Sequence, residues 1–303
     1  GVHKSIMANQ ILHSEVDCDR MDYLLRDAHY TGLKYGSYDR DYLLYHFTAS
    51  TVENHEILTI KHNALHCVED FLMSRYAWYS QVIRSPRGAR YDAIAEKICT
   101  YFVENKLIYR YSDLLEMIEK NPLDFYHFND NYFMGLVHKY YSNGTLDKDP
   151  KIKDMAYTLL LERGAKTAYH STLERKLLNQ DETSLNDKVK KQTLAKIEEI
   201  NQCIAKHGGA ADWIIADFPK KDITLLKSPK QIVKGQSQQN LLLESDPAKI
   251  SFEDGSIRLL AQVENSSISR LYDMKNFTPN VFCSQSAHEI LVREGVVTDI
   301  PES

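Results

Sequence analysis

The chain has 303 residues, of which 43% are hydrophobic and 26% charged, and its formal net charge is −5. These values are ordinary for a globular protein, and without a basic excess a general nucleic-acid binder is not indicated. No apolar run approaches the roughly 18 residues that a membrane-spanning helix needs. The five cysteines are widely spaced and never form Cys-x-x-Cys, which favours reduced thiols in a cytoplasmic protein over disulfides or a zinc site.

Apolar residues at helical spacing predict a helix over residues 17–30, with Asp17 as its N-cap and Gly32 just beyond its end. Residues 42–49 and 56–61 are rich in β-branched and aromatic residues and predict a pair of strands. Further helices are expected over residues 62–84, 89–105, 112–120, 130–142, 150–163 and 184–207.

After Gly209 the chain changes to short apolar runs separated by turns. The sequence Glu253-Asp254-Gly255-Ser256 predicts a hairpin turn, because Asp-Gly tolerates positive φ, and the polar residues 234–240 predict a loop. Strands are expected at residues 213–218, 222–227, 249–252 and 256–263, and short helices at 266–274 and 287–294. We therefore expect a mainly α-helical domain over residues 1–208 and a smaller α+β domain over residues 209–303.

Four polar residues of the first predicted helix, Asp19, Tyr23, Asp27 and Tyr30, fall on one face at helical spacing. Two carboxylates and two phenols on one face are compatible with a binding site. They are equally compatible with the ordinary polar face of an amphipathic helix. Periodicity alone leaves both interpretations open.

Two segments contain more specific sequence motifs. Residues 17–32 read DCDRMDYLLRDAHYTG, and residues 71–82 read FLMSRYAWYSQV, followed by a weaker match in RYDA at 90–93. These motifs resemble those of the HD-domain deoxynucleoside triphosphate triphosphohydrolases and their bacterial and archaeal relatives. The resemblance extends over roughly residues 8–105. In the rest of the chain only the general organisation is similar. It implies part of an HD-type helical bundle that hydrolyses a dNTP to a deoxynucleoside and triphosphate.

The resemblance also implies substrate-binding roles. Arg20 and Arg75 would contact phosphates, for which the planar guanidinium is well suited. Tyr23 and Asp27 would face the sugar, and Tyr79, one helical turn beyond Arg75, would share its face. No catalytic residue is identified in this chain.

Asp19 would be the final ligand of a divalent metal ion such as Mg, Mn or Fe, since hard cations accept carboxylate oxygen. In the family the other ligands are a His and a His-Asp dipeptide well upstream, and none of the twelve His residues here is followed by Asp. Three explanations are open: the chain is a fragment, it is a partner subunit or non-catalytic relative, or the upstream part exists but is absent from this sequence. His62 and His66 have a metal-compatible spacing but no third ligand, so we expect ordinary surface or capping roles.

We therefore expect a metal-dependent nucleotide phosphohydrolase of which this chain supplies part of the active site. The expected partners are a dNTP and either further copies of the chain or a missing N-terminal segment or partner chain. The alternative is a non-catalytic nucleotide-binding or regulatory subunit. A third possibility is an interaction scaffold that uses the C-terminal domain.

Overall fold

The computed structural model describes residues 4–170, 182–218, 223–224, 238–268, 275–276 and 279–298. The chain forms two compact units: the first contains the described residues of Gly1–Arg84 and Lys221–Phe277, the second those of Ser85–Leu173, Gln180–Lys220 and Thr278–Ser303. This division differs from the boundary expected near residues 208–209, because late strands pair with an early hairpin. In class the fold is mainly α-helical with a smaller α+β part, as predicted.

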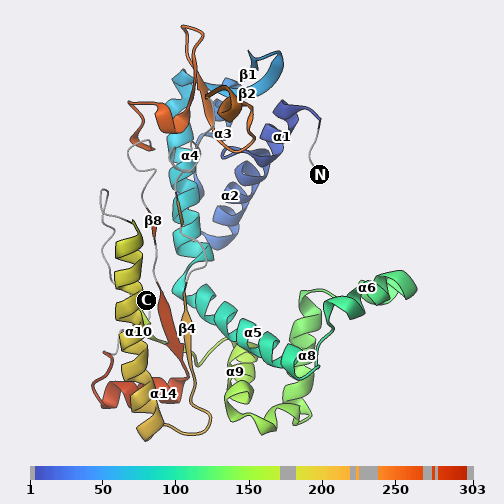
Figure 1. Ribbon diagram of the computed structural model, residues 1–303, viewed down its shortest axis with the longest axis vertical. Coiled ribbons are helices and arrows are strands. Elements are labelled where there is room, and N and C mark those ends of the chain that lie inside the picture. Colours follow the sequence, from blue (N-terminus) through green and yellow to red (C-terminus); the bar gives the residue numbers. More distant parts are fainter. Residues whose placement is uncertain are drawn as a thin grey trace. The chain divides into compact units, whose positions relative to one another are not determined.

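The first unit combines helices with a mixed sheet of strand order β1-β2-β6-β7, in which β2 and β6 are parallel and the other pairs antiparallel (Figure 1). Its described helical segments are α1 (Ile6–His13), α2 (Cys18–Thr31), η1 (Lys34–Gly36), α3 (Arg40–His46), η2 (His62–Ala64), α4 (Leu65–Trp78), the π-helical η3 (Tyr79–Ile83), α12 (Gln238–Leu243) and η5 (Leu260–Gln262). Its described strands are β1 (Phe47–Val52), β2 (His55–Lys61), β5 (Ile223–Thr224), β6 (Lys249–Ser251), β7 (Ile257–Leu259) and β8 (Lys275–Asn276).

Helix α2 has the caps that its sequence predicts. The Asp17 carboxylate accepts a hydrogen bond of 2.8 Å from the Arg20 N–H, and Gly32 ends the helix with φ 69°. Its buried residues, Met21 and Leu24, belong to the core of the first unit. The predicted helix over 17–30 is therefore confirmed.

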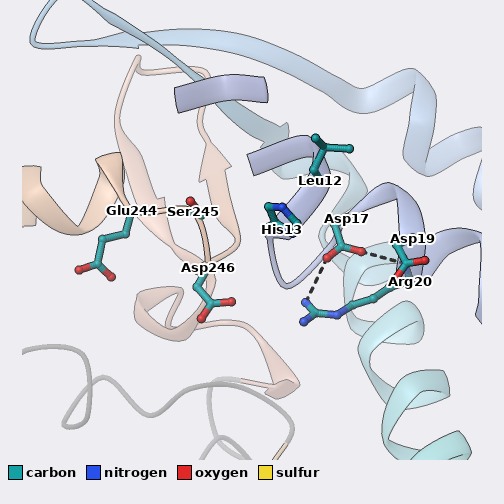
Figure 2. Close-up of a pocket in the computed structure, with 8 residues that line it drawn as sticks. All are labelled: Leu12, His13, Asp17, Asp19, Arg20, Glu244, Ser245 and Asp246. Atoms are coloured by element: carbon teal, nitrogen blue, oxygen red, sulfur yellow. Dashed lines mark hydrogen bonds and ion pairs between the residues drawn. The ribbon is translucent and has the colours of Figure 1, made fainter. Parts of the chain in front are cut away.

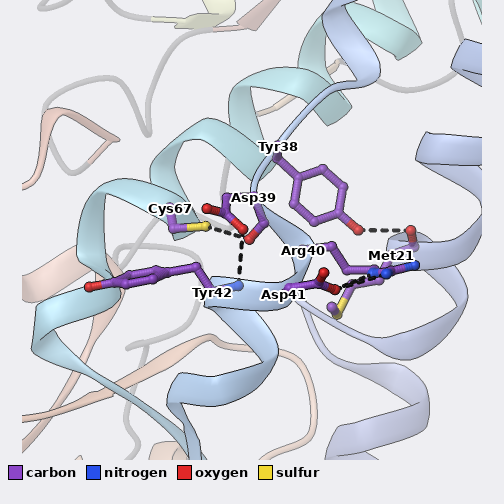
Figure 3. A network of polar contacts seen from close by, with 7 residues as sticks. All are labelled: Met21, Tyr38, Asp39, Arg40, Asp41, Tyr42 and Cys67. Carbon is purple, nitrogen blue, oxygen red and sulfur yellow. Dashed lines mark hydrogen bonds and ion pairs between the residues drawn. The ribbon is translucent and has the colours of Figure 1, made fainter.

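Residues 40–46 form helix α3, so the prediction of a strand from residue 42 is wrong for its first half. The Asp39 side chain accepts from the Tyr42 N–H at 3.0 Å and starts the helix, and Leu43 and His46 are buried at helical spacing. Figure 3 shows this capping contact beside the bond from Cys67 of α4 to the Asp39 carbonyl. Local capping and burial thus outweigh the β-propensity of the segment.

The late strands complete the sheet of the first unit. Ile60 of β2 pairs with Ile250 of β6, and the hairpin β6–β7 turns at Gly255 with φ 82°, which confirms the predicted turn. The expected strand over 256–263 ends at Leu259 and continues as η5. Most of the expected strand 222–227, the end of the helix 266–274 and residues 234–237 lie outside the described residues, and α12 begins within the expected loop.

The second unit packs helices around an antiparallel sheet of order β3-β9-β4. Its described elements are α5 (Pro86–Glu104), α6 (Tyr111–Lys120), α7 (Pro122–Phe125), α8 (Asp130–Ser142), η4 (Thr145–Lys148), α9 (Pro150–Leu161), β3 (Lys166–His170), α10 (Glu182–His207), β4 (Ile214–Asp217), β9 (Asn280–Cys283) and α14 (Gln285–Arg293). The helices predicted here are confirmed within a few residues. Helices α1, α7 and α12 and strands β3, β8 and β9 were not predicted. Across the described ranges, every helix is too short or too polar to cross a membrane.

Candidate functional site

Helices α2 and α4 run alongside each other and place three of the predicted substrate residues in one cluster (Figure 1). The ring centroids of Tyr23 and Trp78 are 4.7 Å apart, and those of Trp78 and Tyr79 are 4.9 Å apart. The guanidinium carbon of Arg75 lies 5.6 Å from the centroid of the Tyr79 ring. We call these four residues the α2–α4 cluster. Trp78 was not singled out from the sequence, although it lies inside the second matching segment.

The Arg75 side chain has unused hydrogen-bonding capacity. Its Nε is buried, and among the described residues it has no hydrogen-bond partner. Burial raises the pKa of Tyr23, while the positive charge of Arg75 acts in the opposite direction. The same charge opposes the raised pKa that burial gives Asp17. The guanidinium is therefore close enough to α2 to act on it electrostatically, and it keeps a buried N–H for an acceptor that the described residues do not supply.

Arg20 is held at the start of α2 by its own chain. Its guanidinium lies 3.6 Å from the Asp17 carboxylate and donates a hydrogen bond to the Ser14 carbonyl. Asp17 is only 4% exposed, and burial raises its pKa despite the nearby Arg20. Because an arginine has five N–H donors, these contacts leave Arg20 able to bind a further anion.

Asp19 faces a polar pocket of about 560 Å³. Figure 2 shows the Asp17–Arg20 ion pair on one side of it and a turn that follows α12 on the other. The lining residues are Leu12, His13, Asp17, Asp19, Arg20, Glu244, Ser245 and Asp246. This turn was not predicted to lie at the site, because it is far from α2 along the chain and has no distinctive motif.

Hydrogen bonds fasten the turn to the connection between α1 and α2. The Glu15 N–H donates to the Asp246 carbonyl at 2.8 Å, and the Glu15 carboxylate accepts from the Ala248 N–H at 3.0 Å. From inside the turn, the Lys249 ammonium donates to the carbonyls of Glu244 at 2.9 Å and Pro247 at 2.7 Å. The acidic wall of the pocket is thus a built part of the first unit.

The described residues that line the pocket do not form a complete metal site. Within the part of the chain that the structure describes, no three His, Cys, Asp or Glu side chains are placed to hold a metal ion together. Asp17 is engaged by Arg20, which leaves Asp19 as a single predicted ligand. His62, one of the two histidines with a metal-compatible spacing, stacks on Phe252 with ring centroids 4.6 Å apart.

The remaining residues of the predicted α2 face do not join the cluster. The Asp27 carboxylate is 3.9 Å from Arg26 Nε and is half-buried. Tyr30 is 82% exposed. The face predicted from helical spacing is therefore divided: Tyr23 packs against α4, Asp19 lines the pocket, and Tyr30 is an ordinary surface residue. The functional roles of all these residues stay predictions.

No family model matches the chain. It is 38% identical over 96 residues to the uncharacterized protein YwfO of Bacillus subtilis and 27% identical over 133 residues to the uncharacterized protein MJ1154 of Methanocaldococcus jannaschii. These matches cover 32% and 44% of this chain. The chain spans only 21% and 29% of the length of the two relatives.

Two solved structures resemble the chain over 93% of its length. One is a phosphohydrolase from Bacteroides thetaiotaomicron, with a TM-score of 0.57, 16% identity and 64% of its chain covered. The chain has a phosphohydrolase-like fold. The other is a hypothetical protein from Aquifex aeolicus, with a TM-score of 0.54, 17% identity and 59% of its chain covered. At these identities the likeness concerns the phosphohydrolase-like fold and not the reaction.

Proposed function

We propose that this chain supplies the nucleotide-binding part of a metal-dependent nucleotide phosphohydrolase that cleaves a dNTP into a deoxynucleoside and triphosphate. The observation that carries the proposal is the placement of Arg75. Its guanidinium lies beside Tyr23 and Tyr79, and its buried Nε has no acceptor among the described residues. A buried, unpaired donor costs about 1–3 kcal/mol, and a phosphate oxygen would remove that cost. One of the solved structures with a similar fold is a phosphohydrolase, which is compatible with the proposal.

The cluster and the pocket suggest a division of tasks. Arg75 and Arg20 would bind phosphate oxygens, because guanidinium groups form strong charge-assisted bonds with them. Tyr23, with its half-buried ring and phenolic tip, would contact the sugar together with Asp27. Tyr79 would support Arg75 from below its guanidinium plane.

A divalent metal, when bound, would polarise a phosphate and lower the pKa of an attacking water. Asp19 would offer one carboxylate oxygen to such a metal. The described residues do not form a complete ligand set for such a metal. The expected cytoplasmic location and oligomeric assembly stay predictions.

The lack of a ligand set among the described residues favours one alternative, a non-catalytic subunit that binds nucleotide. It would use the same arginines and tyrosines but release no product. Binding and hydrolysis therefore have to be measured separately.

The test measures the affinity of each of the four dNTPs by calorimetry, and their hydrolysis with Mn²⁺ or Mg²⁺ by chromatography. We expect Arg75→Ala to weaken binding by about tenfold to a hundredfold, the effect of losing a hydrogen bond to a charged group. Arg40→Ala is the matched control, because Arg40 is an exposed arginine of the first unit paired with Asp41 at 2.8 Å, and it should bind normally.

The outcomes separate the hypotheses. Deoxynucleoside and triphosphate from the wild type, lost in Asp19→Ala, support the enzyme. Binding that depends on Arg75 without any product supports the non-catalytic subunit. Failure of the wild-type chain to bind any dNTP contradicts both.

A further inference from the structure

Trp78 occupies the centre of the α2–α4 cluster. Its ring contacts Tyr23 from α2 at 4.7 Å with an interplanar angle of 36°, and Tyr79 at 4.9 Å with an angle of 85°. Tyr79 in turn lies under Arg75. One indole thus connects a residue proposed to face the sugar with the residues proposed to hold phosphate.

We infer that Trp78 is a positioning residue that keeps Tyr23 and Tyr79 in one binding surface for the nucleotide. The inference rests on the proposed function and assigns a role that neither the sequence motif nor the fold likeness specifies. Trp78 would not contact the reacting atoms. It would act through the two tyrosines that it touches.

Among the described residues, the ring-to-ring contacts of Tyr23 and Tyr79 are both made with Trp78. Tyr23 is on α2 and Tyr79 is the first residue of the π-helix η3, so backbone continuity does not fix their separation. Aromatic pairs of this kind stabilise a packed arrangement beyond the area that they bury. Trp78 and Tyr23 both pack against the core of the first unit, which ties their rings to its rigid part.

The local backbone makes such a contact more important. Segment η3 replaces the α-helical pattern directly after Trp78, and the Arg84 N–H bonds to the Tyr79 carbonyl at 2.8 Å. Single π-helical turns inside longer helices occur often at functional sites. Tyr79 is the first residue of this turn, and its ring meets the Trp78 ring at an interplanar angle of 85°.

Ring packing and hydrogen bonding by Trp78 can be tested separately. Trp78 Nε1 is buried and, among the described residues, has no acceptor. A phenylalanine at this position would keep a ring between the tyrosines and remove only the N–H. Trp78→Phe should therefore preserve the positioning, and Trp78→Leu should abolish it while keeping an apolar side chain.

The first experiment measures affinity for each dNTP in Trp78→Phe, Trp78→Leu and Tyr109→Leu, with urea unfolding to show that each variant is folded. Tyr109→Leu is the matched control, because it removes a comparable ring pair, Tyr109–Tyr132 at 5.4 Å, from the second unit. We expect about a tenfold loss of affinity in Trp78→Leu, less than about threefold in Trp78→Phe, and no change in the control. Equal affinity of Trp78→Leu and the wild type would overturn the inference.

The second experiment needs no nucleotide. Tyrosine rings labelled with ¹³C, with Tyr23 assigned through Tyr23→Phe, report the titration of that phenol. Burial raises the pKa of Tyr23, so loss of the covering indole in Trp78→Leu should lower it toward the ordinary value. An unchanged Tyr23 titration would overturn the inference. If the wild-type chain binds no dNTP, the proposed function fails, and this titration still decides separately whether Trp78 holds the Tyr23 ring.

Discussion

The guanidinium carbon of Arg75 lies 5.6 Å from the ring centroid of Tyr79, four residues further along the chain. The face of an aromatic ring attracts a cation, and such contacts contribute about 0.5–1 kcal/mol at exposed sites and more when water is excluded. The ring therefore orients the guanidinium without using any of its N–H donors. Those donors remain available for a ligand.

Two replacements of Tyr79 should distinguish the contribution of its ring to dNTP affinity from that of its hydroxyl. We expect Tyr79→Phe to bind dNTPs within about twofold of the wild type, because the ring face is retained, and Tyr79→Leu to bind about three- to tenfold more weakly. Calorimetric titration of both variants checks this. An equal loss in Tyr79→Phe and Tyr79→Leu would show instead that the hydroxyl contacts the ligand.

Asp17 should have two separable roles. In Asp17→Ala, α2 loses its N-cap, so the free energy of unfolding should fall by about 1 kcal/mol, and Arg20 loses its ion pair. Asparagine is an equally good cap, so Asp17→Asn should keep the stability while removing the ion pair with Arg20. Urea unfolding and dNTP affinity are measured in parallel. A stable Asp17→Asn variant with unchanged affinity would argue against a binding role for the Asp17–Arg20 pair.

Two glycines should respond oppositely to alanine. A Cβ on Gly36 would lie 2.6 Å from the Leu24 carbonyl oxygen and against the Ala28 side chain, so Gly36→Ala should destabilise the first unit by about 1–3 kcal/mol. Gly135 is exposed in helix α8 with nothing within 4 Å of a new Cβ. Gly135→Ala should stabilise the second unit by about 0.5–1 kcal/mol. Thermal unfolding of each variant shows the sign, and destabilisation in both would contradict the argument.

Lys249 should give the first unit a distinctive pH dependence. Burial lowers its pKa from 10.5 to about 8. Between these values the folded chain binds fewer protons than the unfolded chain, so the free energy of unfolding rises with pH across this window. The gain could reach roughly 3 kcal/mol. Urea unfolding of the wild type and of Lys249→Met is measured from pH 7.5 to 10.5. The free energy of unfolding should rise more steeply with pH in the wild type. Parallel curves would mean that the ammonium is not desolvated.

The Trp78 contacts illustrate why the candidate site could be only partly predicted. Arg75, Tyr79 and Tyr23 were selected by a motif and by helical spacing, which are local. Their convergence depends on how α2 packs against α4, and so does the central place of Trp78. The position of the acidic turn at Glu244–Asp246 could not be predicted, because no motif near it in the sequence indicates that it lies beside α2.

The sequence by itself determined helix α2, from the Asp17 cap to Gly32, and the Gly255 turn, because caps, periodicity and positive φ depend on neighbouring residues. Only the tertiary structure decided that residues 40–46 are helical, that β6 joins β2 in parallel, and that residues 244–246 form a wall of the pocket beside Asp19. These outcomes depend on burial and pairing between segments that are distant along the chain. Such contacts are made with partners that no local pattern identifies.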